Sequence, residues 1–211
     1  MRSRILLAAA LACGVAHAAP AVPALLTPPM ASFGPSQQAM PALIQRYELD
    51  HASLAHLYTV RNGIARDAEF DRFYRQWLAA LEALPFDTLE VDDRIDWVML
   101  RNQIEFELRE QGDIASRFRQ AEPLVPFVRP LIDMAEARRL MKPQAGRATA
   151  ALLQKSLVEV QQATERLKAG GDVLSAKPMA SRSTANRAVK VLGELSADLK
   201  EWYGYYDGYD P

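Results

Sequence analysis

Apolar residues recur at intervals of three and four along most of the chain, and no stretch alternates in the manner of a β-strand. The strongest repeat lies between about Asp67 and Leu84. Its apolar positions are Phe70, Phe73, Tyr74, Trp77, Leu78, Leu81 and Leu84. This spacing predicts an amphipathic helix that lays an aromatic stripe on a core.

Two further helices are predicted around this one. The first begins at Ser36, which can cap it, and runs to about Val60 before the turn Asn62-Gly63. The other runs from about Asp92 to Gln111 and is closed by Gly112. Their candidate core positions are Ile44, Tyr47, Leu54, Leu57 and Tyr58 in the first, and Ile95, Val98, Met99, Ile104, Phe106 and Leu108 in the other.

The rest of the chain continues the helical pattern. Prolines 123, 126 and 130 predict a rigid irregular connector over 122–130, followed by a short helix to about Met141. A fifth helix over about 144–168 ends at Gly170-Gly171, and a connector with Pro178 leads to a sixth over about 184–203. Core contacts are expected from Leu124, Val125, Phe127 and Val128 in the connector, and from Leu192, Leu195, Leu199 and Trp202 in the last helix. The predicted fold is all-α, with about six helices in an irregular antiparallel array.

The N-terminus has the form of a secretory signal peptide. Arg2 and Arg4 precede an apolar run over 5–15, and Ala16-His17-Ala18 supplies an A-x-A cleavage site before Ala19. This predicts a signal peptide over 1–18 and a periplasmic or secreted protein. The apolar run is shorter than the roughly 20 residues that a membrane span needs.

Cys13 is the only cysteine, and the surrounding Leu11-Ala12-Cys13-Gly14 also resembles a lipoprotein attachment box. The simple cleavage is favoured because the apolar stretch before Cys13 is short, and it removes the thiol from the mature chain. It also removes Arg2 and Arg4, which lowers the basic count from 25 to 23 against 26 acidic residues. A mature net charge of −3 argues against nucleic acid as a partner.

The mature chain divides into a leader and one domain. Residues 19–38 are rich in Ala and Pro and are predicted to be a disordered leader, and 39–211 to be the helical domain. The segment 202–211 holds five of the seventeen aromatic residues. Such apolar area must be covered by the preceding helices, by a partner or by further polypeptide, and the last is favoured, with the domain truncated at its C-terminus.

No catalytic or metal-binding constellation is predicted. His51 and His56 are five residues apart, about 140° around a helix, so they cannot chelate one zinc ion as an i, i+4 pair does. Glu48-x-x-His51 has the spacing of a di-iron helix but occurs once. The charged ladder of the third helix, such as Arg101 with Glu105, is typical of solvated salt bridges. Nucleophile, phosphate-loop and dinucleotide motifs do not occur in the sequence.

Several segments carry a family resemblance. They are 46–50 (RYELD), Phe73-Tyr74 with Trp77-Leu78 and Leu81, 84–89 (LPFDTL), 93–105 (DRIDWVMLRNQIE) and 202–211 (WYGYYDGYDP). The chain resembles in these segments the N-terminal part of the bacterial proteins grouped as domain of unknown function 885. The last segment is similar to one that lies mid-chain in those proteins.

The resemblance implies a mostly helical, secreted or lipid-anchored protein similar to gluzincin-type zinc metallopeptidases. Their H-E-x-x-H helix belongs to a C-terminal half that this sequence lacks, so no catalytic residue, metal ligand or cofactor is carried over. Arg94, Asp96, Arg101 and Asn102 match the family pattern, as do Trp202, Tyr206 and Asp207 in the aromatic segment. The expected role of the third-helix residues is structural, pairing that helix with its neighbours.

Two hypotheses of different classes remain open. In the first, the chain is the N-terminal helical region of an extracytoplasmic metallopeptidase-like protein, inactive by itself and partnered by the metal-binding half, which would act on peptides. In the second, it is a stand-alone secreted helical binding or scaffold module that covers its terminal aromatics in its own core or in a dimer.

Overall fold

The computed structural model describes residues 39–169 and 180–208, which form six α-helices and two short 3₁₀ helices with no strand among them. The all-α fold class is therefore confirmed. The elements are α1 (Ala39–Leu57), α2 (Ile64–Glu82), η3 (Phe86–Thr88), α3 (Val91–Ala121), η4 (Glu122–Leu124), α4 (Val128–Arg139), α5 (Gly146–Ala169) and α6 (Arg182–Tyr206). The signal peptide, Cys13, the leader, Ser36, the Gly170-Gly171 stop and Pro178 lie outside the described residues.

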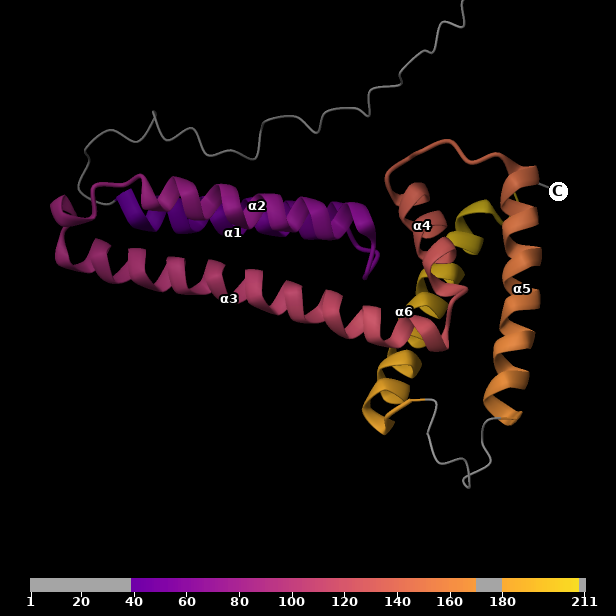
Figure 1. Cartoon of the computed structure of the whole chain (residues 1–211). Coiled ribbons are helices and arrows are strands. Elements are labelled where there is room, and N and C mark those ends of the chain that lie inside the picture. Colours follow the sequence, from indigo (N-terminus) through magenta and orange to yellow (C-terminus); the bar gives the residue numbers. More distant parts are fainter. Residues whose placement is uncertain (1–38, 170–179, 209–211) are drawn as a thin grey trace, which may run out of the picture.

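Helices α1 and α2 lie along the N-terminal part of α3 and form an elongated layer with it (Figure 1). The aromatic stripe of α2 supplies five of the twelve buried residues of the core there, as the hydrophobic pattern predicts: Phe70, Phe73, Tyr74, Trp77 and Leu81 are all buried. Tyr47 of α1 stacks on Phe73 at a centroid distance of 5.4 Å and meets Trp77 edge-on at 5.4 Å. Such aromatic pairs add to the stabilisation that the buried area itself provides.

Helices α4, α5 and α6 gather at the other end of α3 (Figure 1). The second core lies among them and includes Phe118, Val128, Ile132, Ala135 and Leu195. α6 packs on both α3 and α4, whereas α5 packs on α4. The long helix α3 thus connects two separate cores.

The predicted end of the third helix at Gly112 is wrong. α3 is 31 residues long and continues past Gly112 to Ala121, and Gly112 is an exposed position in its interior. A glycine costs about 1 kcal/mol there relative to alanine. Packing of the residues after it, including the buried Phe118 and Ala121, outweighs that cost.

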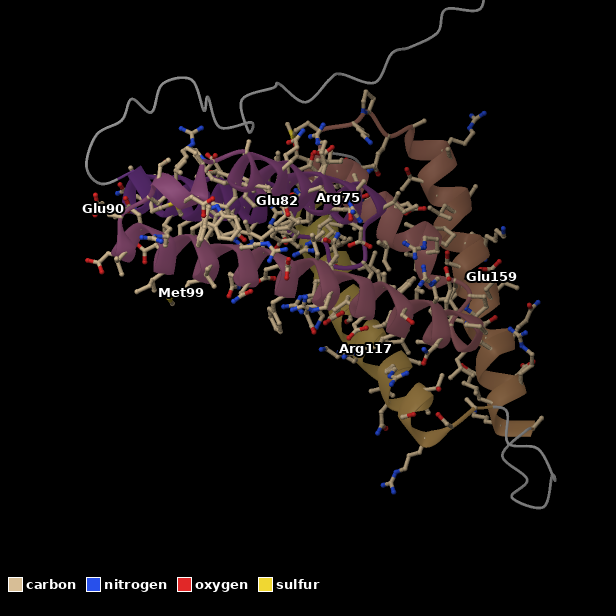
Figure 2. The ribbon with its side chains drawn as sticks, turned by 60° about the vertical axis from the view of Figure 1, so that its left-hand side comes forward. Arg75, Glu82, Glu90, Met99, Arg117 and Glu159 are labelled. Atoms are coloured by element: carbon tan, nitrogen blue, oxygen red, sulfur yellow. The ribbon has the colours of Figure 1, made fainter. Side chains whose placement is uncertain are left out.

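The predicted core face of the third helix is also partly wrong. Ile104 is buried and Leu108 packs on the first core, but Ile95, Val98, Met99 and Phe106 are exposed by 54, 42, 64 and 52%. In Figure 2, Met99 lies on the side of α3 that faces away from α1 and α2. The apolar arc of the helix is wider than the strip that α1 and α2 cover.

The connector over 122–130 is shorter than predicted, because α4 already begins at Val128 with Pro130 in its first turn. A proline fits there since it has no N–H to leave unpaired. Val125, Phe127 and Val128 are buried and Leu124 is partly buried, as predicted. In α1 the prediction for Leu57 is wrong, since this side chain is 47% exposed.

Candidate functional site

The family-pattern residues of the third helix lie together in the first half of α3. Arg101 forms ion pairs with Glu105 at 2.8 Å and with Glu82 of α2 at 3.9 Å, and its guanidinium lies 5.8 Å from the Trp97 ring. Trp97 Nε1 donates a hydrogen bond to the backbone oxygen of Leu81 at 2.8 Å. These contacts hold α3 against α2.

The other three family-pattern residues of α3 differ in exposure. Asn102 is exposed, and Asp96 and Arg94 are half-buried. Arg94 Nε is nevertheless inaccessible to solvent and, among the described residues, has no hydrogen-bond acceptor. Arg94 lines an apolar surface hollow of about 450 Å³ together with Phe86, Val91, Ile95, Val98 and Met99.

The aromatic residues at the end of α6 are only partly covered. Trp202 is half-buried, and its Nε1 donates to Gln144 Oε1 at 3.4 Å, while its ring lies 4.9 Å from that of Tyr206. Arg138 lies 4.9 Å from the Tyr205 ring. Tyr203 and Tyr205 remain 63 and 48% exposed, and Asp207 is exposed. The preceding helices therefore bind one side of the segment.

The predicted residues do not form one site. Residues 94–102 lie toward one end of the α1–α3 layer, whereas the end of α6 lies among the helices at the other end of the molecule (Figure 1). Ala18 and Ala19, at the predicted cleavage point, lie outside the described residues, as do 209–211 of the aromatic segment.

The two helical histidines are separated by their environments. His56 is exposed, whereas His51 is half-buried and its Nε2 lies 3.0 Å from the Tyr74 hydroxyl. Tyr74 in turn donates a long hydrogen bond of 3.5 Å to Glu107 of α3. Burial raises the pKa of Tyr74 well above its ordinary value, and the Glu107 carboxylate raises it further. The phenol thus stays protonated and joins α1, α2 and α3.

Sites of two other kinds do not occur in the described ranges. In residues 39–169 and 180–208, His, Asp and Glu side chains do not gather in groups of three that could hold a metal ion. No helix in the same ranges has both the length and the apolar character needed to cross a membrane.

The buried carboxylate of Glu136, which no sequence motif indicates, links the helices at the two ends of the molecule. Glu136 of α4 accepts hydrogen bonds from the backbone N–H groups of Ala65 at 3.0 Å and Arg66 at 2.9 Å, in the first turn of α2. A helix N-terminus favours a negative charge, because its first N–H groups lack partners within the helix. The contact spans about 70 positions, so no local motif marks it.

The surrounding turn is shaped by the same carboxylate. A Cβ on Gly63 would come within 2.7 Å of Glu136 Cδ, and closer still to its Oε1, so a side chain at this position would displace the carboxylate. Arg129 Nη1 donates to the backbone oxygen of Asn62 at 2.8 Å, and its guanidinium lies 4.3 Å from the Phe118 ring. The Asn62-Gly63 signal in the sequence marks this turn, which lies between α1 and α2.

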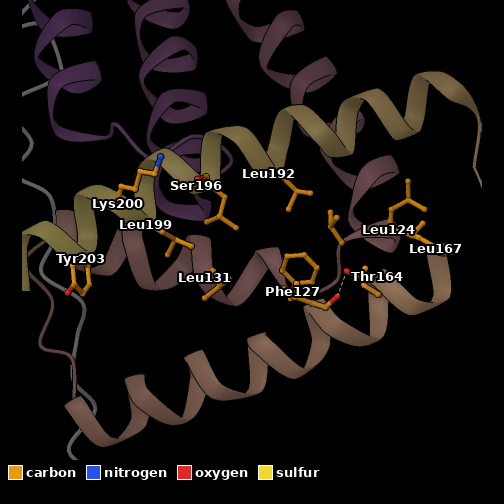
Figure 3. Close-up of a pocket in the computed structure, with 14 residues that line it drawn as sticks. Leu124, Phe127, Leu131, Thr164, Leu167, Leu192, Ser196, Leu199, Lys200 and Tyr203 are labelled. Carbon is orange, nitrogen blue, oxygen red and sulfur yellow. Dashed lines mark hydrogen bonds between the residues drawn. The ribbon is translucent and has the colours of Figure 1, made fainter.

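A large hollow in the described part of the chain is an apolar groove between α5 and α6, with α4 as its floor. Its volume is about 740 Å³. The lining is almost wholly aliphatic and aromatic, with Thr164, Ser196 and Lys200 as the polar members: Leu124, Val125, Phe127, Leu131, Val160, Ala163, Thr164, Leu167, Leu192, Leu195, Ser196, Leu199, Lys200 and Tyr203. Figure 3 shows the α5 and α6 side chains facing each other across it. The groove is a candidate site for binding apolar groups.

Comparison of the chain with protein-family models, with curated proteins and with solved structures found no match in any of the three. Function must therefore be inferred from the sequence pattern and from the geometry of the helices.

Proposed function

We propose that this chain is the N-terminal helical region of an extracytoplasmic protein similar to zinc metallopeptidases, and that it acts by packing against the polypeptide that holds the zinc. The resemblance of 46–50, 84–89, 93–105 and 202–211 to domain of unknown function 885 supports this proposal. The predicted signal peptide supports the location outside the cytoplasm. In this proposal the chain supplies no catalytic residue.

The observation that carries the proposal is the exposed apolar face of α3. Val91, Ile95, Val98 and Met99 are 63, 54, 42 and 64% exposed, and they lie within or beside the segment with the strongest family resemblance. Burial of such a side chain is worth about 1 kcal/mol or more. Residues of this size, gathered on one helix face, are typical of a surface that another polypeptide covers.

Arg94 borders the same face. It lines the hollow with Ile95, Val98 and Met99, and a guanidinium can pair with a carboxylate or a backbone carbonyl of the packed polypeptide. The proposed contact is therefore apolar, with one cationic side chain at its edge.

The test isolates the native protein from the cell envelope and measures its intact mass, its zinc content and its hydrolysis of unfolded protein substrates. We expect a mass well above the 23.5 kDa of the chain, bound zinc, and hydrolysis that a chelator abolishes. A mass equal to that of the processed chain, with neither zinc nor hydrolysis, would contradict the proposal.

A matched pair of variants connects this test to the α3 face. Met99→Glu should lower activity at least tenfold, since it places a charge in the proposed contact. Gln45→Glu adds the same charge at an exposed position of α1 and should leave activity unchanged. Equal activity of both variants would remove α3 from the proposed contact.

The second candidate function, a stand-alone helical binding module, is favoured by the groove between α5 and α6. The groove is large and apolar. One of its walls is α5, which packs mainly on α4. Recovery of the native protein as the short chain would select this function over the first.

A further inference from the structure

Helix α5 is the least covered helix in the described part of the chain. Of its 24 residues only Ser156 and Ala163 are buried. Leu153, Leu157 and Leu167 are 37, 52 and 47% exposed. A helix held by so little apolar contact is incompletely stabilised within one chain, because most helical stability in proteins comes from packing.

The exposed positions of α5 follow a heptad repeat. All six positions of the repeat are exposed, and their spacing alternates between three and four residues: Ala150, Leu153, Leu157, Val160, Thr164 and Leu167. Spacing of this kind is the pattern of a seam that packs against another helix. The last three positions also line the α5–α6 groove, so the seam and the groove are one continuous surface.

We propose that this surface binds a second copy of the same chain, with the two α5 helices antiparallel and each lying in the groove of the other. The inference goes beyond the proposed function and uses a different face of the molecule. In this dimer α5 of each copy lies between α5 and α6 of its partner, in a symmetric four-helix arrangement.

The seam is complementary to itself in the antiparallel direction. Leu157 lies opposite Val160 of the second copy, Leu153 opposite Thr164, and Ala150 opposite Leu167. The central flanking positions are Gln154 opposite Gln161, which are neutral. No like charges meet in the middle of the seam.

The expected area is sufficient for a stable dimer. A 24-residue helix is about 36 Å long and roughly 10 Å wide. Contact along one such face and along the groove wall buries about 700 Å² on each copy. The total of about 1,400 Å² lies in the range of specific interfaces.

The ends of the seam supply a test of direction. Arg147 lies opposite Lys168 of the second copy only when the helices are antiparallel, and this pair repels. Arg147→Glu converts both symmetry-related repulsions into attractions. We expect the variant to dimerise roughly fivefold more tightly at low salt, and the difference to shrink as salt is added.

The main experiment measures the mass of the full chain by light scattering during size exclusion, over a roughly hundredfold range of concentration. Cys13→Ser is present throughout to exclude a disulfide. We expect twice the chain mass at high concentration, and a monomer for Leu157→Glu. Gln162→Glu adds the same charge on the opposite side of α5 and should remain dimeric.

Three outcomes overturn the proposal. They are a monomer at every concentration, a dimer that Leu157→Glu leaves intact, and an Arg147→Glu dimer no tighter than the unaltered one. The Arg147→Glu result also keeps the proposal testable if Leu157→Glu fails to fold, which circular dichroism would show. A monomer leaves the proposed function standing, because that depends on the α3 face.

Discussion

At the scale of single residues, Glu136 and Gly63 show how a side chain and a missing side chain act together. The carboxylate caps α2 from α4, and the absence of a Cβ at Gly63 makes room for it. The φ of Gly63 is −70°, so its constraint is steric and not conformational.

Gly63→Ala should therefore lower the free energy of unfolding by roughly 2 kcal/mol or more, since the new methyl group displaces the buried carboxylate from its two N–H donors. Urea denaturation followed by circular dichroism measures the change. A loss no larger than that of an ordinary surface substitution would show that the Glu136 contact is dispensable.

Tyr74 gives a prediction of pH dependence. Its pKa is raised above the ordinary 10.0 by burial and by Glu107, so the folded protein keeps a proton that the unfolded chain loses. The free energy of unfolding should thus be unaffected by this group below about pH 10 and should fall as the pH rises above it. Denaturation at several alkaline pH values measures the slope, and Tyr74→Phe should reduce it; Tyr47, whose pKa is raised in the same way, accounts for part of the remainder.

At the scale of elements, α3 shows that packing can carry a helix through a residue that favours its end. Gly112 is exposed, and a Cβ there would meet nothing within 4 Å. Gly112→Ala should raise the free energy of unfolding by about 0.5 to 1 kcal/mol through the helix propensity of alanine. A destabilised variant would mean that α3 is bent or broken at this position.

The N-terminus of α6 has a local cap that can be tested separately. The Ser181 hydroxyl accepts a hydrogen bond from the Thr184 N–H at 3.1 Å. Ser181→Ala should cost about 1 kcal/mol, measured by thermal or urea denaturation. Ser181→Asp, which can also cap a helix, should retain the stability of the unaltered protein.

At the scale of the whole molecule, the two cores are connected by α3 and by the contacts of Glu136 and Arg129 with the start of α2 and the turn before it. Gly112→Pro should interrupt α3 between the cores, at a cost of about 3 kcal/mol, and so weaken their coupling. We expect a single unfolding transition in the unaltered protein and two in this variant, as seen by calorimetry. Gly112→Ala serves as the control and should keep the single transition.

The sequence by itself determined the helical class, the number of helices and the core of α2, because these depend on local propensity and on a periodicity that one helix displays alone. The aromatic stripe from Phe70 to Leu81 needs only a period of 3.6 residues to be recognised. The turn at Asn62-Gly63 was marked in the same local way.

Only the tertiary structure decided which apolar faces are covered. Met99 and Ile104 look equally suited to a core in the sequence, yet one is 64% exposed and the other is buried, because the difference depends on where α1 and α2 lie. The same holds for the seam on α5, whose exposure follows from the gap between α5 and α6. Glu136 belongs to this class as well, since its two donors are about 70 positions away and meet it only when the chain has folded.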